Sequence, residues 1–189
     1  RLSSAASDVY KRQFNECSDL MLKIMKLPQP VIAQIPGVAA AAGCQLVATC
    51  DLAIASNEAV FITPGVNIGL FCSTPMVAVS RSLGRKKTME MLLTGESMNA
   101  EDAVSFGLIN KKVPLNELEI TVLNFAKLIA SKPTSTVRIG KEAFYKQAEL
   151  PIEKAYKYTS EVMAQNMLKK DAKEGIEAFL EKREPKWEN

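Results

Sequence analysis

The stretch VIAQIPGVAAAAGCQLVATCDLAIAS, residues 31–56, decides the fold class and contains the candidate site. It opens with a β-rich apolar run that ends at Pro36, and small residues then lead into Gly43. A helical pattern follows, and Asp51 opens a second apolar run. A strand, a helix and a further strand in succession predict an α/β core.

The glycines of this stretch allow a ligand to come close to the main chain. Gly37 and Gly43 lack a Cβ atom, and the alanines between them add little more. Amide N–H groups that open a helix here point at electron-rich atoms, which is how an oxyanion hole is built from main chain. The alternative is a small-residue helix packed tightly on a sheet, and the residues alone leave both open.

The composition excludes several classes of function. The chain has 189 residues, enough for one domain with a sizeable core, and 47% of them are hydrophobic. Its net charge of +3 is scattered without interleaved aromatic residues, so we expect no nucleic-acid surface. Every apolar stretch is broken by a charge, a proline or a polar residue before it reaches membrane-spanning length, so we expect no membrane segment.

The lack of histidine removes common catalytic and metal-binding groups. Without histidine there is no Ser-His-Asp triad, no Cys-His pair and no imidazole ligand. The cysteines at 17, 44, 50 and 72 lack metal-ligand spacing, so we predict free thiols and no metal site. The glycines also lack the spacing of a dinucleotide- or ATP-binding loop, so no cofactor is expected.

Periodicity and chain breakers predict strands and helices in the first half and helices in the second. The expected elements are helices at 14–27, 40–49, 74–83, 86–93 and 100–106, and strands at 31–35, 52–55, 60–62 and 109–113. Gly84 and Gly95 are predicted as left-handed C-caps of helices. From Leu115 onward the chain is predicted to be helical, with breaks at Pro133, Pro151 and near Gly175.

Several ordered motifs resemble the signature of the crotonase (enoyl-CoA hydratase/isomerase) superfamily. In that family P-V-I-A-x-(V/I)-x-G is followed by small residues, by G-G-C-E-L and by C-D-(I/L)-x-x-A, an order close to that of residues 30–55. The likeness runs from about Phe14 to Trp187 and includes FITP (61–64), NIGL (67–70) and MLLTG (91–95). The resemblance implies a crotonase-type spiral of ββα units and a C-terminal helical oligomerisation region.

The resemblance also implies the substrate and the residues around it. An acyl-CoA thioester binds with its carbonyl between two backbone N–H groups, and coenzyme A belongs to the substrate, not to a separate cofactor. The second N–H group maps onto Ala42, where relatives have glycine, and the first has no counterpart in this sequence. The substrate-binding positions carried over are Ala39, Ala41, Ala42, Gly43, Pro64, Gly65 and Ser73.

Two glutamates that position and activate water in hydratases map onto Gln45 and Gly65. Glutamine does not take up a proton near neutral pH, and glycine offers only its backbone. Losing one general acid or base costs roughly 10²- to 10⁴-fold in rate. We therefore predict an enoyl-CoA hydratase-like, acyl-CoA-binding protein of fatty-acid metabolism that is weak or atypical as a hydratase. The alternative is a non-catalytic acyl-CoA binder or subunit partner on the same fold.

The C-terminal tail is the other region that the resemblance singles out. Phe179, Lys182 and Arg183 belong to a tail that many relatives place near the adenine or the phosphates of CoA. Lys182 and Arg183 could bind the 3′-phosphate, although basic residues at a helix end are also an ordinary complement to the helix dipole. Apolar and aromatic residues form a stripe along 152–167, which covers its own core or a neighbouring subunit. The family's use of this region predicts a homo-oligomer, a trimer or a dimer of trimers.

The first thirteen residues, RLSSAASDVYKRQ, do not join the pattern, because they lack apolar periodicity and a signal-like hydrophobic region. We predict a non-native leader over 1–13, a crotonase-fold core without its N-terminal part over 14–131, and a helical region over 132–189. By resemblance the protein is mitochondrial in a eukaryote and cytoplasmic in a bacterium, and no targeting signal is readable in this sequence.

Overall fold

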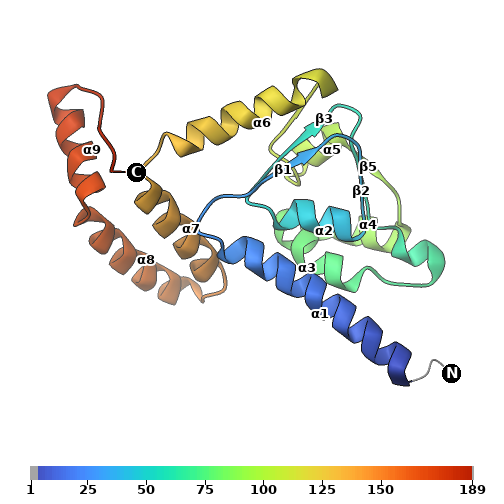
Figure 1. Ribbon diagram of the computed structural model, residues 1–189. Helices are drawn as coiled ribbons and strands as arrows, with labels where there is room; N and C mark the ends of the chain where they lie inside the picture. The colour runs from blue at the N-terminus through green and yellow to red at the C-terminus, as the bar shows by residue number, and fades with distance from the viewer. Residues whose placement is uncertain (1–3, 189) are drawn as a thin grey trace. The chain divides into compact units, whose positions relative to one another are not determined.

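The computed structural model describes residues 4–188, and the chain divides into two compact units (Figure 1). The core unit comprises residues 1–25 and 31–124, and the helical unit comprises residues 26–30 and 125–189.

The described part of the core unit contains two small sheets. In one, the parallel strands lie in the order β1 (Ile32–Ile35), β3 (Leu52–Ser56), β6 (Lys111–Val113). In the other, β4 (Val60–Ile62) lies between the parallel strand β2 (Val38–Ala40) and the antiparallel strand β5 (Met98–Asn99). The chain moves from one sheet to the other between β1 and β2, and again between β3 and β4, before entering a helix. This arrangement confirms the expected spiral of ββα units.

Helices complete both units. Those that lie largely in the core unit are α1 (Ser4–Lys26), α2 (Ala42–Thr49), the 3₁₀ helix η1 (Pro64–Ile68), α3 (Ser73–Ser82), α4 (Arg85–Thr94) and α5 (Ala100–Ser105). The helix α6 (Leu115–Ala130) runs into the helical unit, which continues with α7 (Thr134–Ala148), α8 (Ile152–Met167) and α9 (Lys170–Glu181). In the core unit α2 packs against α3, and in the helical unit α7 packs against α8.

The core unit is held together by buried apolar side chains and by one carboxylate at a strand start. Phe61 and Val79 are fully buried in the main apolar cluster of this unit, and Ile54 is fully buried in β3. The N–H of Val31 donates to Oδ2 of Asp51 at 2.7 Å, which fixes the entry of β1 beside the start of β3. Burying large apolar side chains contributes most of the stability of such a unit.

Two predicted helix boundaries are wrong, and for one of them a tertiary contact explains the difference. Gly84 is not a left-handed cap: it is the extended N-cap of α4, with φ −60°, whereas Gly95 does adopt the left-handed conformation, with φ +64°. Gly175 does not break a helix but lies inside α9, and the break falls at Leu168–Lys169. A Cβ atom on Gly175 would be 3.2 Å from the ring of Trp187, so this glycine allows the C-terminal segment to pack closely on α9.

Two segments become regular structure where the sequence pattern did not predict it. The helix α1 already begins at Ser4, ten residues before the predicted start at Phe14. Residues 38–40 form β2, which the pattern did not predict because three small residues carry almost no periodic signal. Pairing with β4 is what makes this segment a strand.

Candidate functional site

Parallel pairing of β2 and β4 brings most of the predicted site residues together. Ala40 is paired with Ile62, so both strands end at the same edge of the sheet. The turn Ala41–Gly43 and the loop that begins at Thr63 leave this edge next to each other, and the Ala41 N–H donates to the Ile62 carbonyl at 2.9 Å. The predicted residue Ala39 lies just before this edge and is buried in β2.

A single strained residue, Ala41, connects the strand β2 to the helix α2. Ala41 has φ +48° and ψ −110°, a conformation that L-residues rarely adopt. It lets the chain leave β2 and start α2 within a single residue. The sequence predicted a turn of small residues here but carried no sign of the positive φ, because the position is occupied by alanine and not by glycine.

The helix α2 presents free amides at its start, as the oxyanion-hole hypothesis requires. Its first intrahelical bond runs from the N–H of Gln45 to the carbonyl of Ala41 at 3.0 Å, so the N–H groups of Ala42, Gly43 and Cys44 have no intrahelical acceptor. Ala42 is exposed and has the negative φ of a helical residue. A Cβ atom on Gly43 would meet no atom within 4 Å, so open space lies next to these amides. The geometry can donate hydrogen bonds to a developing anion.

Gln45 is held inside the protein and is only 4% exposed. Its Oε1 accepts a hydrogen bond from the thiol of Cys17 on α1, with a distance of 3.7 Å between sulfur and oxygen. A side chain that activates water needs access to that water and needs to exchange a proton, and buried glutamine offers neither. Cys17 was not predicted as a partner, because 28 residues separate the two positions.

The loop around Gly65 is closed against its own chain. A Cβ atom at this position would lie 2.8 Å from the carbonyl oxygen of Leu70 and 2.9 Å from Sγ of Cys72. The N–H of Leu70 donates to the carbonyl of Gly65 at 2.9 Å and holds this contact in place. A glutamate side chain therefore does not fit at position 65 unless the loop 65–72 moves.

Two further contacts fix this loop on α4. The hydroxyl of Thr63, which is fully buried, donates to the carbonyl of Met91 at 3.0 Å. The amide group of Asn67 lies against Gly95, where an added Cβ atom would be 2.8 Å from Nδ2. The predicted residue Pro64 is the first residue of η1, and Ser73 is exposed at the start of α3 with its hydroxyl turned to the Phe71 carbonyl. The sequence did not predict the roles of Thr63 and Asn67, because each depends on a distant helix.

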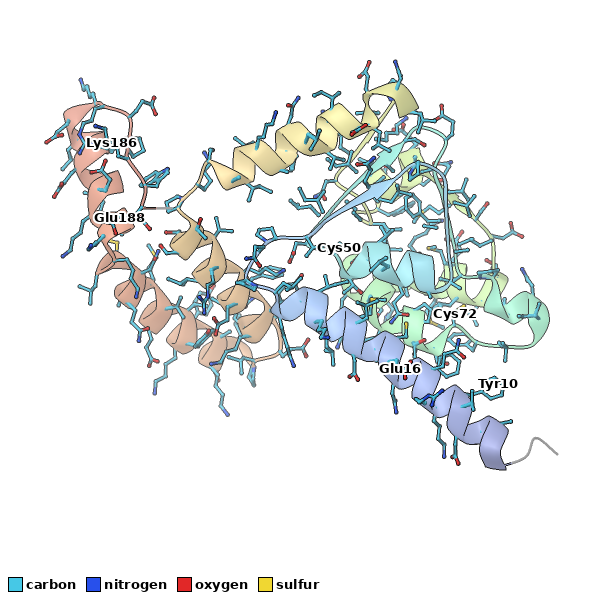
Figure 2. All side chains as sticks on the ribbon, viewed as in Figure 1. Tyr10, Glu16, Cys50, Cys72, Lys186 and Glu188 are labelled. Carbon is cyan, nitrogen blue, oxygen red and sulfur yellow. The ribbon has the colours of Figure 1, made fainter. Side chains whose placement is uncertain are left out.

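The cysteines of residues 4–188 form no disulfide bond. Cys72 lies at the start of α3 and Cys50 at the end of α2 (Figure 2). Burial raises the pKa of the Cys44 thiol to about 12, with a further contribution from Cys72. Cys44 is thus a neutral thiol at physiological pH and packs in the core as a small apolar side chain. Among residues 4–188, no group of three or more Cys, Asp or Glu side chains has the geometry of a metal site.

The helical unit contains the predicted tail residues. Phe179 is 81% exposed on α9, and Lys182 is exposed directly after it, with φ +56°. The apolar stripe of α8 is only partly buried in this unit. Ala155 is buried, whereas Ile152, Tyr156 and Met163 are exposed. None of the helices in residues 4–188 is long and apolar enough to cross a bilayer.

Known proteins share this fold and much of this sequence. The chain is 49% identical over 180 residues to human "enoyl-CoA hydratase domain-containing protein 3, mitochondrial". The aligned region covers 95% of the chain and 59% of the human protein. The crystal structure of that human protein has a TM-score of 0.93, at 47% identity, with 98% of this chain and 74% of that one covered. The crystal structure of an enoyl-CoA hydratase from Mycobacterium smegmatis has a TM-score of 0.95 at 48% identity. The match covers 100% of this chain and 72% of that one.

The chain spans about 60% of the length of the rat and mouse proteins of the same name, which it also matches. The family model "Enoyl-CoA hydratase/isomerase" matches residues 3–189. The ββα spiral, the ordered motifs and this match agree, and the chain belongs to the enoyl-CoA hydratase/isomerase family.

Proposed function

We propose that the protein binds acyl-CoA thioesters of fatty-acid metabolism and hydrates them poorly. One observation supports this proposal most directly. The N–H groups at the start of α2 have no intrahelical acceptor, and the neighbouring positions 45 and 65 hold no carboxylate. Ala42 would donate its N–H to the thioester oxygen, and Ala39, Ala41, Gly43, Pro64 and Ser73 would line the acyl group. The thioester brings its own coenzyme A, and no other cofactor is needed for this chemistry.

The surroundings of positions 45 and 65 support poor hydration. The buried side chain of Gln45 accepts a hydrogen bond from the thiol of Cys17. The space beside Gly65 is filled by Leu70 and Cys72. A hydratase needs a group that moves a proton to or from water, and neither position supplies one. An oxyanion hole without these groups still stabilises an enolate-like or tetrahedral oxyanion by roughly 2.7–4 kcal/mol for each donor.

Turnover of crotonyl-CoA by purified protein tests this proposal. We expect hydration at least about 10³-fold slower than that of an ordinary hydratase, because two proton-transfer groups are missing. Binding of a saturated acyl-CoA, measured by calorimetry on the same preparation, should persist. Slow turnover with binding supports the proposal, no turnover with binding supports the non-catalytic alternative, and ordinary turnover contradicts both.

Assembly and compartment are proposed from the family. The exposed stripe of α8 and the exposed residues Phe179 and Leu180 of α9 are suited to a subunit contact, so we propose a trimer or a dimer of trimers. We propose a mitochondrial location if the source is a eukaryote, as the name of the human relative states for that protein, and a cytoplasmic one if it is a bacterium. Light scattering and cell fractionation test these two statements.

A further inference from the structure

The helices of the helical unit enclose a groove, here called the α8–α9 groove. Helices α7, α8 and α9 and the segment after α9 contribute Thr136, Asn166, Ile176, Leu180 and Trp187 to its wall. Its volume of about 440 Å³ lies in the range of small-molecule sites. Of the described residues that line this groove, none is a lysine or an arginine.

One hydrogen-bond acceptor in the groove has no donor. Asn166 lies near the end of α8, and its Oδ1 atom is buried and accepts no hydrogen bond from the described part of the chain. A buried oxygen of this kind has given up its hydrogen bonds to water without replacing them, which is rare in folded proteins. The atom therefore indicates an occupant that donates a hydrogen bond.

A buried carboxylate gives the same groove a negative charge. Asp171, in the first turn of α9, is 7% exposed and lines the groove. Its oxygens accept hydrogen bonds from the hydroxyl of Ser135 at 2.6 Å and from the N–H of Glu188 at 3.2 Å. Both donors are neutral, and the neighbouring Lys170 is paired with the side chain of Glu188. The carboxylate is thus hydrogen-bonded, but no ion pair within residues 4–188 neutralises it.

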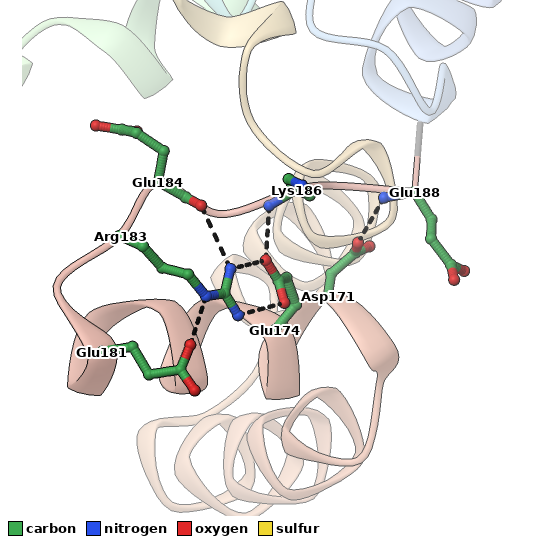
Figure 3. Close-up of polar contacts among 7 residues, drawn as sticks. All are labelled: Asp171, Glu174, Glu181, Arg183, Glu184, Lys186 and Glu188. Atoms are coloured by element: carbon green, nitrogen blue, oxygen red, sulfur yellow. Dashed lines mark hydrogen bonds and ion pairs between the residues drawn. The ribbon is translucent and has the colours of Figure 1, made fainter.

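The aromatic wall of the groove is fixed in place. The ring of Trp187 lies on Gly175, where an added Cβ atom would be 3.2 Å from it. A clasp at the end of α9 holds the segment that leads to this ring: the guanidinium of Arg183 donates to both carboxylate oxygens of Glu174, at 2.6 and 3.0 Å (Figure 3). The N–H of Lys186 also donates to Glu174, at 2.7 Å. The indole is therefore held as one side of the groove before any ligand arrives.

These features together match an organic cation. An ammonium group donates N–H bonds to an amide oxygen, is attracted by a carboxylate and is favoured at the face of an indole ring. Ile176 and Leu180 are 44% and 72% exposed, so they offer apolar surface to an alkyl chain. An anionic ligand is disfavoured, because it would meet the charge of Asp171 without a basic residue to balance it.

We propose that the α8–α9 groove binds a primary alkylammonium, with an N–H group on Oδ1 of Asn166, its charge beside Asp171 and Trp187, and its alkyl chain along Ile176 and Leu180. The groove is built from the helical unit alone, so this inference does not depend on the proposed acyl-CoA binding. It explains why a buried amide oxygen has no donor and why the adjacent carboxylate has no cationic partner.

Titration of the purified protein with hexylammonium tests the proposal. Trp187 is the only tryptophan of the chain, so its fluorescence reports directly on this groove. Two comparison ligands separate the contributions, because 1-hexanol lacks the charge and hexyltrimethylammonium lacks the N–H groups. We expect hexylammonium to bind roughly tenfold more tightly than the alcohol and roughly fivefold more tightly than the trimethylated cation.

Two variants assign these preferences to residues. Asn166→Leu, which removes the orphan oxygen, should bring the preference over hexyltrimethylammonium below about twofold. Asp171→Asn, which keeps an oxygen for Ser135, should bring the preference over 1-hexanol below about threefold. Ratios of dissociation constants are compared, because a general loss of stability does not change them. Gln165→Leu is the matched control, since it removes an exposed amide of α8 outside the groove and should leave both ratios unchanged.

Equal affinities for the three ligands overturn the proposal, and so do preferences that survive in both Asn166→Leu and Asp171→Asn. The amide of Nα-acetyl-lysine is the last ligand to compare. If it binds at least about tenfold more tightly than hexylammonium, the groove holds a lysine side chain of another protein and the assignment to a free amine is wrong. Weaker or equal binding of the lysine derivative supports the free amine. Calorimetry with acyl-CoA on the same preparation decides the proposed function separately.

Discussion

Two turns in this protein force a non-glycine residue into a positive φ, and they are held in different ways. Within residues 4–188, Ala41 and Lys182 are the two such residues. Ala41 is held by a main-chain hydrogen bond and by the packing of small residues. Its N–H donates to a carbonyl of β4, and the neighbouring loop is closed around Gly65. Lys182 is held by charged side chains, chiefly the pair of Glu174 and Arg183.

The turns at Ala41 and Lys182 are stabilised by different forces, so they should respond to different changes. Main-chain bonds and close packing depend little on salt or pH, and they fail when volume is added. Partly exposed ion pairs tolerate added volume but weaken when salt screens them or when the carboxylate takes up a proton. The turn at Ala41 should therefore respond to steric changes, and the turn at Lys182 to changes of charge.

The largest expected effect is steric. Gly65→Ala should destabilise the protein by about 1–3 kcal/mol, because the new methyl group meets Leu70 and Cys72 at less than 3.0 Å. Gly43→Ala is the control, since no atom lies within 4 Å of its Cβ position, and it should be neutral or slightly stabilising. Denaturant unfolding measures both. Equal stabilities for the two variants would mean that the loop around Gly65 is not closed as described.

The next effect concerns ligand binding at the same turn. If the proposed function holds, Ala42→Val should weaken binding of a saturated acyl-CoA by roughly tenfold, or about 1.4 kcal/mol, because a β-branched group would stand on the proposed path of the thioester. Gln45→Ala should weaken it less, since that side chain is buried against Cys17 and does not change the amide of Ala42. Calorimetry compares the two. If Gln45→Ala is equally harmful or worse, the pocket is not arranged around the Ala42 N–H.

A smaller effect is expected from releasing the strain itself. Ala41→Gly should stabilise the protein by about 0.5–1 kcal/mol, because glycine adopts the positive φ without the steric cost of a Cβ atom. Ala40→Gly, in the neighbouring strand position, should destabilise by a similar amount, because glycine only adds chain entropy there. Thermal unfolding distinguishes them. A loss of stability in Ala41→Gly would show that the turn is not strained.

The smallest effect is expected at the clasp. Glu174 has a pKa of about 2 in the folded protein, below its ordinary value, so its stabilising contribution is complete above pH 5 and is lost as the pH falls toward 2. The melting temperature of Glu174→Gln should lie at most a few degrees below that of wild type at pH 6, and the difference should shrink toward pH 2 and in 1 M salt. Glu177→Gln, on the same helix, is the control. A difference that is independent of pH would exclude the ion pair as its source.

Much of the core unit was predictable because its signals are local. Apolar runs bounded by Pro36 and Asp51 predicted the strands β1 and β3, which the structure confirms. The strand β2 was missed because its side chains are small, and its structure depends on pairing with β4, twenty-two residues further on.

The sequence by itself determined the family, the spiral of ββα units and the residue types at positions 45 and 65, glutamine and glycine, since composition and ordered motifs are properties of the chain. Only the tertiary structure decided that Ala41 carries the strain, that position 65 has no room for a side chain, and that Glu174 forms an ion pair with Arg183. Each of these results depends on atoms brought together from distant parts of the chain or on a backbone angle that the residue type does not reveal. Residue types therefore identified the candidate site, and packing and hydrogen bonding decided what each residue can do there.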